Sequence, residues 1–166
     1  MVAMVRRADP LNDPAPLIRR IYGYVAYRIG DGPEAEDVAA EVFERAVRYR
    51  ESYDPNRSAP ATWLTAIARG VLADRAAQHV PAPVGDPPDE ADPADLEAES
   101  VQRLDLRAAV AQLSERDREL IGLRYGADLA AAQIAELLEA EPHAIEVALS
   151  RAVARLRALT DVAAGV

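Results

Sequence analysis

The chain has 166 residues, half of them hydrophobic, which is enough to bury the core of one ordinary domain or of two small ones. It has no cysteine and only two histidines, so a disulfide framework and a thiolate metal site are excluded, and we expect no metal or other cofactor. Residues 1–12 lack the apolar core of a signal peptide and no apolar run approaches the roughly 20 residues of a membrane span, so we expect a cytoplasmic protein without membrane insertion.

The formal net charge of −9 argues at first against a nucleic-acid partner, because phosphate binding is driven by clustered positive charge. The distribution of the charge weakens that objection. Residues 1–80 hold 11 arginines and 11 acids, residues 81–105 hold one arginine and 8 acids, and residues 106–166 hold 7 arginines and 9 acids. Most of the acidic excess therefore lies in one segment.

That segment, PAPVGDPPDEADPADLEAE, combines five prolines with a dense acidic run and almost no large apolar residue. Such a composition cannot offset the entropy lost on ordering, so we predict a flexible acidic linker over residues 80–99. The linker separates predicted domains at residues 1–79 and 100–166. We interpret its charge as that of a solvated spacer; the alternative is a mimic of nucleic acid that competes for a basic surface.

Before the linker, the apolar pattern predicts three helices and no strand. The first runs to a break at residues 30–32, the second begins at Pro33 and ends near residues 53–56, and the third runs from about Pro60 to about Gln78. Their apolar stripes are Leu17, Ile18, Ile21, Tyr22, Val25 and Ile29; Val38, Val42, Phe43, Ala46 and Val47; and Trp63, Leu64, Ile67, Ala68, Val71 and Leu72.

After the linker we expect four more helices. One carries Val101 to Leu113, and the next runs from Glu115 to Tyr125 with Ser114 as its N-cap and Gly126 as its stop. A short helix over residues 129–138 and a tight connection over 139–141 then lead to a last helix opened by Pro142. Its predicted buried face is Ile145, Leu149, Val153 and Leu156. Two helices joined this tightly have the geometry of a helix-turn-helix.

Two stretches carry a resemblance to a known family. EAEDVAAEVFERAVRYRESYDP followed by WLTAIARGVLAD resembles the second conserved region of bacterial sigma factors. LSERDRELIGLRYGADLAAAQIAELL followed by AIEVALSRAVARLRAL resembles their fourth region. The order and the intervening linker are similar to the small extracytoplasmic-function class of the sigma-70 family, so the resemblance implies an all-α protein with two small helical domains.

The resemblance also implies a role and its residues. The first domain would bind the clamp helices of core RNA polymerase, and the second would read the upstream promoter element in the major groove through the last helix. The polymerase-binding candidates are Asp37, Glu41 and Phe43. The DNA-binding candidates are Arg57, Trp63, Arg69, Asp74, Arg75, His143, Arg151 and Arg155. An anti-sigma partner is a further expectation from the resemblance.

The residues themselves leave alternatives open. The acids Glu36, Asp37, Glu41 and Glu44 share one side of a helix and fit a basic coiled coil, and a solvated helix face explains them equally well. An exposed Trp63 would stack on unpaired bases, but its place on the apolar stripe favours burial. His143 is near the start of the last helix, where it would contact phosphate; we favour an exposed turn residue.

The chain also departs from the family pattern. Ala77 and Gln78 stand where relatives usually place two arginines, Glu139 replaces the usual turn glycine, and Glu146 lies in the recognition helix, where it accepts only from cytosine and repels phosphate. We therefore carry two hypotheses. The leading one is a sigma factor that directs promoter-specific initiation, and the alternative is a sigma-like protein that binds polymerase or an anti-sigma partner without reading promoters.

The third functional class that we consider is an enzyme. We find no nucleophile with a base, no metal triad and no glycine-rich phosphate loop, so the sequence predicts no catalytic residue.

Overall fold

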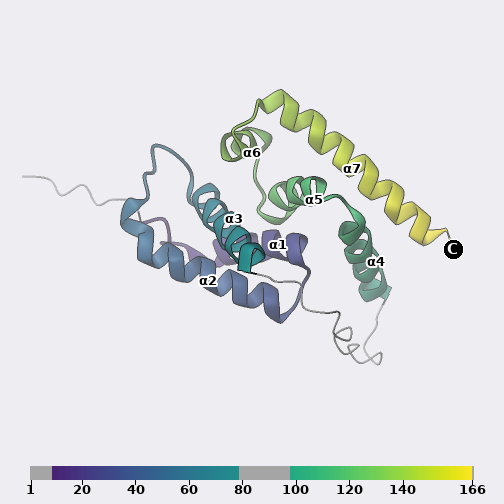
Figure 1. Ribbon diagram of the computed structural model, residues 1–166, viewed down its shortest axis with the longest axis horizontal. Helices are drawn as coiled ribbons and strands as arrows, with labels where there is room; N and C mark the ends of the chain where they lie inside the picture. The colour runs from purple at the N-terminus through teal and green to yellow at the C-terminus, as the bar shows by residue number, and fades with distance from the viewer. Residues whose placement is uncertain (1–8, 79–97, 166) are drawn as a thin grey trace, which may run out of the picture.

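A computed structural model describes residues 9–78 and 98–165 of the chain, and within these ranges every regular element is a helix (Figure 1). The predicted all-α fold is confirmed. The elements are α1 (Pro14–Ile29), α2 (Pro33–Tyr49), the 3-10 turn η1 (Arg50–Ser52), α3 (Pro60–Gln78), α4 (Ala98–Gln112), α5 (Glu115–Ile121), the π-helical turn η3 (Gly122–Gly126), α6 (Ala131–Leu138) and α7 (Pro142–Ala164). Residues 80–97 of the predicted linker lie outside the described residues, and its last two residues, 98 and 99, belong to α4.

Helices α1, α2 and α3 form one bundle and bury most of the predicted apolar stripes against each other. Three predicted members, Ile18, Ile29 and Val47, are instead exposed, because they lie at the edges of the stripes. A proline opens each helix, which suits a position whose backbone N–H has no helical partner. Helix α1 ends at Ile29, and the φ of 90° at the following Gly30 lies in the left-handed region that favours glycine. The predicted start of α2 and both ends of α3 are confirmed. Fully buried members of the bundle core include Ile21, Val25, Val38, Val42, Leu64 and Val71.

Helices α4 to α7 form the second module. The predicted N-cap of α5 is confirmed, because the Ser114 hydroxyl accepts a hydrogen bond from the backbone N–H of Asp117 at 3.2 Å. Helix α6 begins at Ala131, two residues later than predicted, and the Gln133 side chain accepts from the backbone N–H of Ala130 at 2.9 Å. Ile145 and Leu149 are buried as predicted, whereas Val153 and Leu156 are only partly buried.

The two modules pack against each other, which the sequence did not predict. Helix α1 lies along η3 and α5, and α3 approaches α6 (Figure 1). One continuous cluster of buried residues therefore includes Ile21 and Leu64 from the first module together with Leu123 and Ile134 from the second. Helix α7 lies at the outer side of the second module, away from α1 to α3.

The connection between α6 and α7 contains a backbone conformation that the sequence makes unfavourable. Glu139 has φ 53° and ψ 47°, the left-handed region, which costs a residue with a Cβ roughly 1 kcal/mol or more relative to glycine.

We therefore expect Glu139→Gly to raise the free energy of unfolding by about 1 kcal/mol, measured by urea titration followed by circular dichroism. Glu136→Gly is the matched control: it lies inside helical α6, so the same change there should lower stability by about 1 kcal/mol. Equal effects of the two substitutions would contradict this explanation.

Candidate functional site

The contact between the modules depends on glycines at which backbone meets backbone. A Cβ built on Gly126 of η3 would lie 2.6 Å from the backbone nitrogen of Tyr24 and 2.7 Å from the carbonyl carbon of Gly23, both in α1. A Cβ on Gly23 would lie 3.0 Å from the carbonyl oxygen of Gly126. Only residues without side chains allow this approach. Gly126 thus does more than end a helix, the only role that the sequence pattern indicated.

Ion pairs surround this backbone contact. Arg20 of α1 pairs with Asp128 at 3.3 Å, Arg28 of α1 pairs with Glu115 at 3.4 Å, and Arg107 of α4 pairs with Asp31. Tyr24 is fully buried among them, and this burial raises the pKa of its hydroxyl to about 12. The hydroxyl therefore stays protonated at neutral pH.

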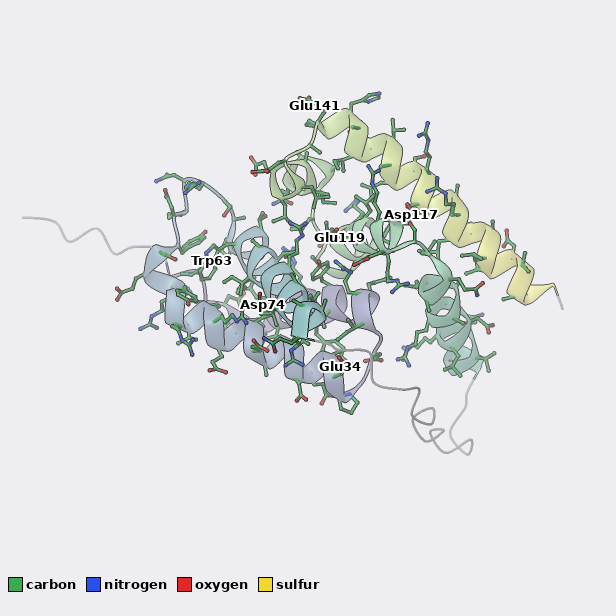
Figure 2. The ribbon with its side chains drawn as sticks, viewed as in Figure 1. Glu34, Trp63, Asp74, Asp117, Glu119 and Glu141 are labelled. Carbon is green, nitrogen blue, oxygen red and sulfur yellow. The ribbon has the colours of Figure 1, made fainter. Side chains whose placement is uncertain are left out.

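Arg69, a DNA-binding candidate, lies at the same interface. Its Nε donates to a carboxylate oxygen of Glu119 on α5 at 2.7 Å, and its Nη1 donates to the backbone carbonyl of Leu137 at 3.4 Å. Figure 2 places Glu119 on the side of α5 that faces the first module. In this conformation Arg69 is engaged by the second module.

Three other candidates meet in one network between α2 and α3. The carboxylate of Glu41 accepts from Arg45 at 2.7 Å and from two nitrogens of Arg75 at 3.0 and 3.1 Å, and Arg45 also donates to Asp74 at 2.8 Å. Burial opposes ionisation of Glu41, but the hydrogen bonds from Arg75 and Arg45 outweigh it and lower the pKa of Glu41. The network ties a polymerase-binding candidate to two DNA-binding candidates and supports the bundle.

The remaining candidates of the first module differ in exposure. Asp37 is exposed on α2, and Arg57 is exposed in the connection before α3. Phe43 is partly buried against the core. Trp63, at the start of α3, is also only partly buried, and its ring packs on that of Tyr53 with 5.3 Å between centroids (Figure 2). The predicted burial of Trp63 is thus met in part.

Helix α7 presents a mixed surface. His143 and Glu146 are exposed, with 3.7 Å between the imidazole Nδ1 and a carboxylate oxygen. Arg151 is exposed and lines a shallow groove together with Arg116 and Arg155. Arg155 donates to Asp117 at 2.7 Å, and the Asp117 side chain is only 9% exposed. This pair joins α7 to α5, so Arg155 has a structural contact in addition to the contact with DNA that the resemblance implies.

Sequence reasoning missed the interface itself. Arg28 and Glu119 were not candidates, because each lies on an amphipathic helix, where a charged residue is expected on the solvent-facing side. Gly23 and Gly126 offered one signal: two glycines in otherwise helical segments, of which Gly23 stands inside a helix and lowers its propensity.

No helix in residues 9–78 and 98–165 combines the length and the apolar character needed to cross a membrane. The same residues contain no group of three or more His, Cys, Asp or Glu side chains placed to hold a metal ion.

Comparison with known proteins accounts for both modules. Residues 16–80 match the family described as Sigma-70 region 2, and residues 103–156 match Sigma-70, region 4. The chain is 34% identical to the ECF RNA polymerase sigma factor ShbA of Streptomyces griseus, over 76% of this chain and 70% of that one. The chain belongs to the extracytoplasmic-function (ECF) class of sigma-70 RNA polymerase sigma factors. We call its modules region 2 (α1 to α3) and region 4 (α4 to α7).

Two further similarities extend over most of this sigma factor. It is 30% identical to the ECF sigma factor BldN of Streptomyces coelicolor over 84% of its own length, and spans about half, 55%, of that relative. The structure of the sigma factor RpoE in complex with the anti-sigma factor NepR, from Bartonella quintana, superposes with a TM-score of 0.65 at 20% identity, covering 88% of this chain and 92% of that one. The predicted family and fold are confirmed.

The close contact at Gly126 predicts that a side chain there lowers the stability of the protein. Because the Cβ of Gly126→Ala would meet α1 backbone, which cannot move aside like a flexible side chain, the substitution should lower the free energy of unfolding by about 1–3 kcal/mol, measured by urea titration.

Gly70→Ala on α3 is the matched control. No atom lies within 4 Å of a Cβ there, so alanine should be neutral or stabilise the helix by up to about 1 kcal/mol. A Gly126→Ala protein as stable as wild type would show that the backbones of α1 and η3 are not held at this distance.

Proposed function

We propose that this sigma factor binds core RNA polymerase, directs it to specific promoters in the cytoplasm, and catalyses no reaction itself. The observation that carries the proposal is the presence, in one chain and in the family's order, of a region 2 bundle and a region 4 helix-turn-helix. Sigma factors are in general regulators without enzymatic activity.

The exposed acids of α2 support the polymerase contact. Asp37 is exposed on a turn that also carries Glu34 and Glu36, and Glu44 lies further along the helix in a weak pair with Arg48 at 3.3 Å. Such a face suits a basic partner helix, because charge complementarity steers docking and sets its register. Glu41 contributes less, since Arg45 and Arg75 already occupy its carboxylate.

Region 4 supports the DNA contact. In a helix-turn-helix the first turns of the second helix enter the major groove, and here those turns belong to α7. Arg116, Arg151 and Arg155 line one groove beside it and can contact phosphates, which positions the helix without reading sequence.

The likeness to RpoE bound to NepR supports a second partner. We propose that an anti-sigma factor binds this chain while its two regions are packed together. Release of that partner would precede polymerase binding.

One observation favours the alternative of a sigma-like regulator that does not read promoters. The exposed side chains in the first turns of α7 include His143, Glu146 and Ser150, and the helix has no arginine before Arg151. Arginine is the side chain that most often reads bases, so this surface discriminates weakly.

Run-off transcription separates the two functions. With core polymerase and a pool of genomic fragments, the proposed function predicts transcripts that begin at a restricted set of sites sharing a common upstream element. Asp37→Arg should weaken binding to core polymerase roughly tenfold and lower all of these transcripts together, because it reverses an exposed charge at the docking face.

Asp161→Arg is the control: it makes the same change of net charge at an exposed position near the end of α7 and should leave binding unchanged. Binding to core polymerase without any restricted set of start sites would reject the sigma-factor function in favour of the regulator. Unaltered binding of Asp37→Arg would reject the docking face on α2.

A further inference from the structure

Three groups of region 2 converge on one oxygen of region 4. The Oε1 atom of Glu119 lies 2.7 Å from Nε of Arg69, 3.2 Å from Nη1 of Arg28, and 3.5 Å from the hydroxyl of Tyr24. Arg28 also donates to the Tyr24 hydroxyl at 3.1 Å, which fixes the guanidinium against a fully buried ring. Figure 2 labels Glu119 at this junction of the two regions. The carboxylate thus fills a site whose donors all belong to region 2.

The site is partly withdrawn from solvent. The side chain of Arg28 is 16% exposed, that of Glu119 is 21% exposed, and that of Arg69 is 34% exposed. Charges in such a setting interact more strongly than on an open surface, because water screens them less. Arg28 and Arg69 come from α1 and α3, which pack together within region 2, so the two guanidinium groups would stay close if region 4 moved away.

If region 4 moves away, the two guanidinium groups lose this carboxylate and become available to another anion at the same place. The anion must present oxygen atoms to guanidinium nitrogens, which a phosphate does as well as a carboxylate. This step rests on the proposed function, under which region 2 lies beside promoter DNA. The oxygen anion nearest to region 2 is then a phosphate of the DNA backbone.

We propose that Arg28 and Arg69 form a binding site for a backbone phosphate of promoter DNA, and that the Glu119 carboxylate occupies this site while region 4 is packed on region 2. The same two arginines serve either partner, so packing of the regions and DNA binding at this site exclude each other. Arg69 was expected to contact DNA; Arg28 and the competing role of Glu119 are new.

The test measures the affinity of the full chain for a fluorescent single-stranded oligonucleotide of roughly ten nucleotides, by anisotropy and without polymerase. Glu119→Gln keeps the size of the side chain and removes its charge, so Arg69 loses its carboxylate partner and Arg28 keeps only the longer pair with Glu115 at 3.4 Å. We expect the oligonucleotide to bind roughly fivefold to tenfold more tightly, with a steeper dependence on salt.

Asp128→Asn is the matched control. It removes another ion pair between the regions, with Arg20 at 3.3 Å, but leaves the two-arginine site intact. Asparagine also tolerates the left-handed backbone of this residue, φ 54°. We expect a change in affinity below about twofold, since exposed pairs contribute little. A gain equal to that of Glu119→Gln would show that loosening of the regions, and not release of the arginines, raises affinity, and would overturn the proposal.

A second experiment tests whether the tighter oligonucleotide binding of the Glu119→Gln protein depends on the two arginines. In the Glu119→Gln protein, the further changes Arg28→Gln and Arg69→Gln should together abolish the tighter binding, and inorganic phosphate should compete only at far higher concentration than the oligonucleotide. A gain that survives both changes, or an affinity of folded Glu119→Gln equal to wild type, overturns the proposal. Equal competition by inorganic phosphate would identify a general anion site and would overturn the assignment to DNA.

Folding is checked separately by circular dichroism. If Glu119→Gln fails to fold, Arg69→Gln in the otherwise wild-type chain decides: the proposal requires weaker oligonucleotide binding, and unchanged binding overturns it. Because no arm contains polymerase or a promoter start site, failure here leaves the transcription result intact, and failure of transcription leaves this binding result intact.

Discussion

The close contact of α1 with η3 is the constraint on which the rest of the arrangement depends. A Cβ on Gly126 would lie 2.6 Å from the backbone nitrogen of Tyr24, so the two backbones meet without side chains between them. That distance brings α5 near enough for Glu119 to reach Arg28 and Arg69. The exposed ion pairs, such as Arg20–Asp128, would not hold the regions together, because such pairs are worth on the order of 0–1 kcal/mol each. Burial of apolar surface around Tyr24 and Leu123 supplies the larger contribution.

This packing affects the two DNA-directed surfaces differently. Arg69 of region 2 is engaged by Glu119 and by the carbonyl of Leu137, whereas the first turns of α7 stay exposed at the outer side of region 4. The packed form therefore engages Arg69, a DNA-binding candidate of region 2, and leaves accessible the turns of α7 that we propose enter the major groove.

The sequence predicted the helices well because their signals are local. Apolar spacing identified most of the buried faces of α1 to α3, although Ile18, Ile29 and Val47 are exposed. Prolines marked the helix starts, and Ser114 identified the start of α5. The family resemblance then identified region 2 and region 4 in the right order. The interface was not predictable in the same way, since it joins Gly23 to Gly126 and Arg69 to Glu119 across a linker, and no local pattern encodes such a contact. For the same reason the pairing of Glu41 with Arg75 was missed: each charge read alone looks like part of a solvated helix face.

The most direct test of the account is the distance between the two regions in the isolated chain. The sequence has no cysteine, so Ala73→Cys on α3 and Ala132→Cys on α6, both exposed, provide two unique positions for spin labels. Pulsed electron paramagnetic resonance should give one narrow distribution of distances, because α1 and η3 hold region 4 in a single position on region 2. A broad distribution, as expected for two domains that move independently on a tether, would contradict the account.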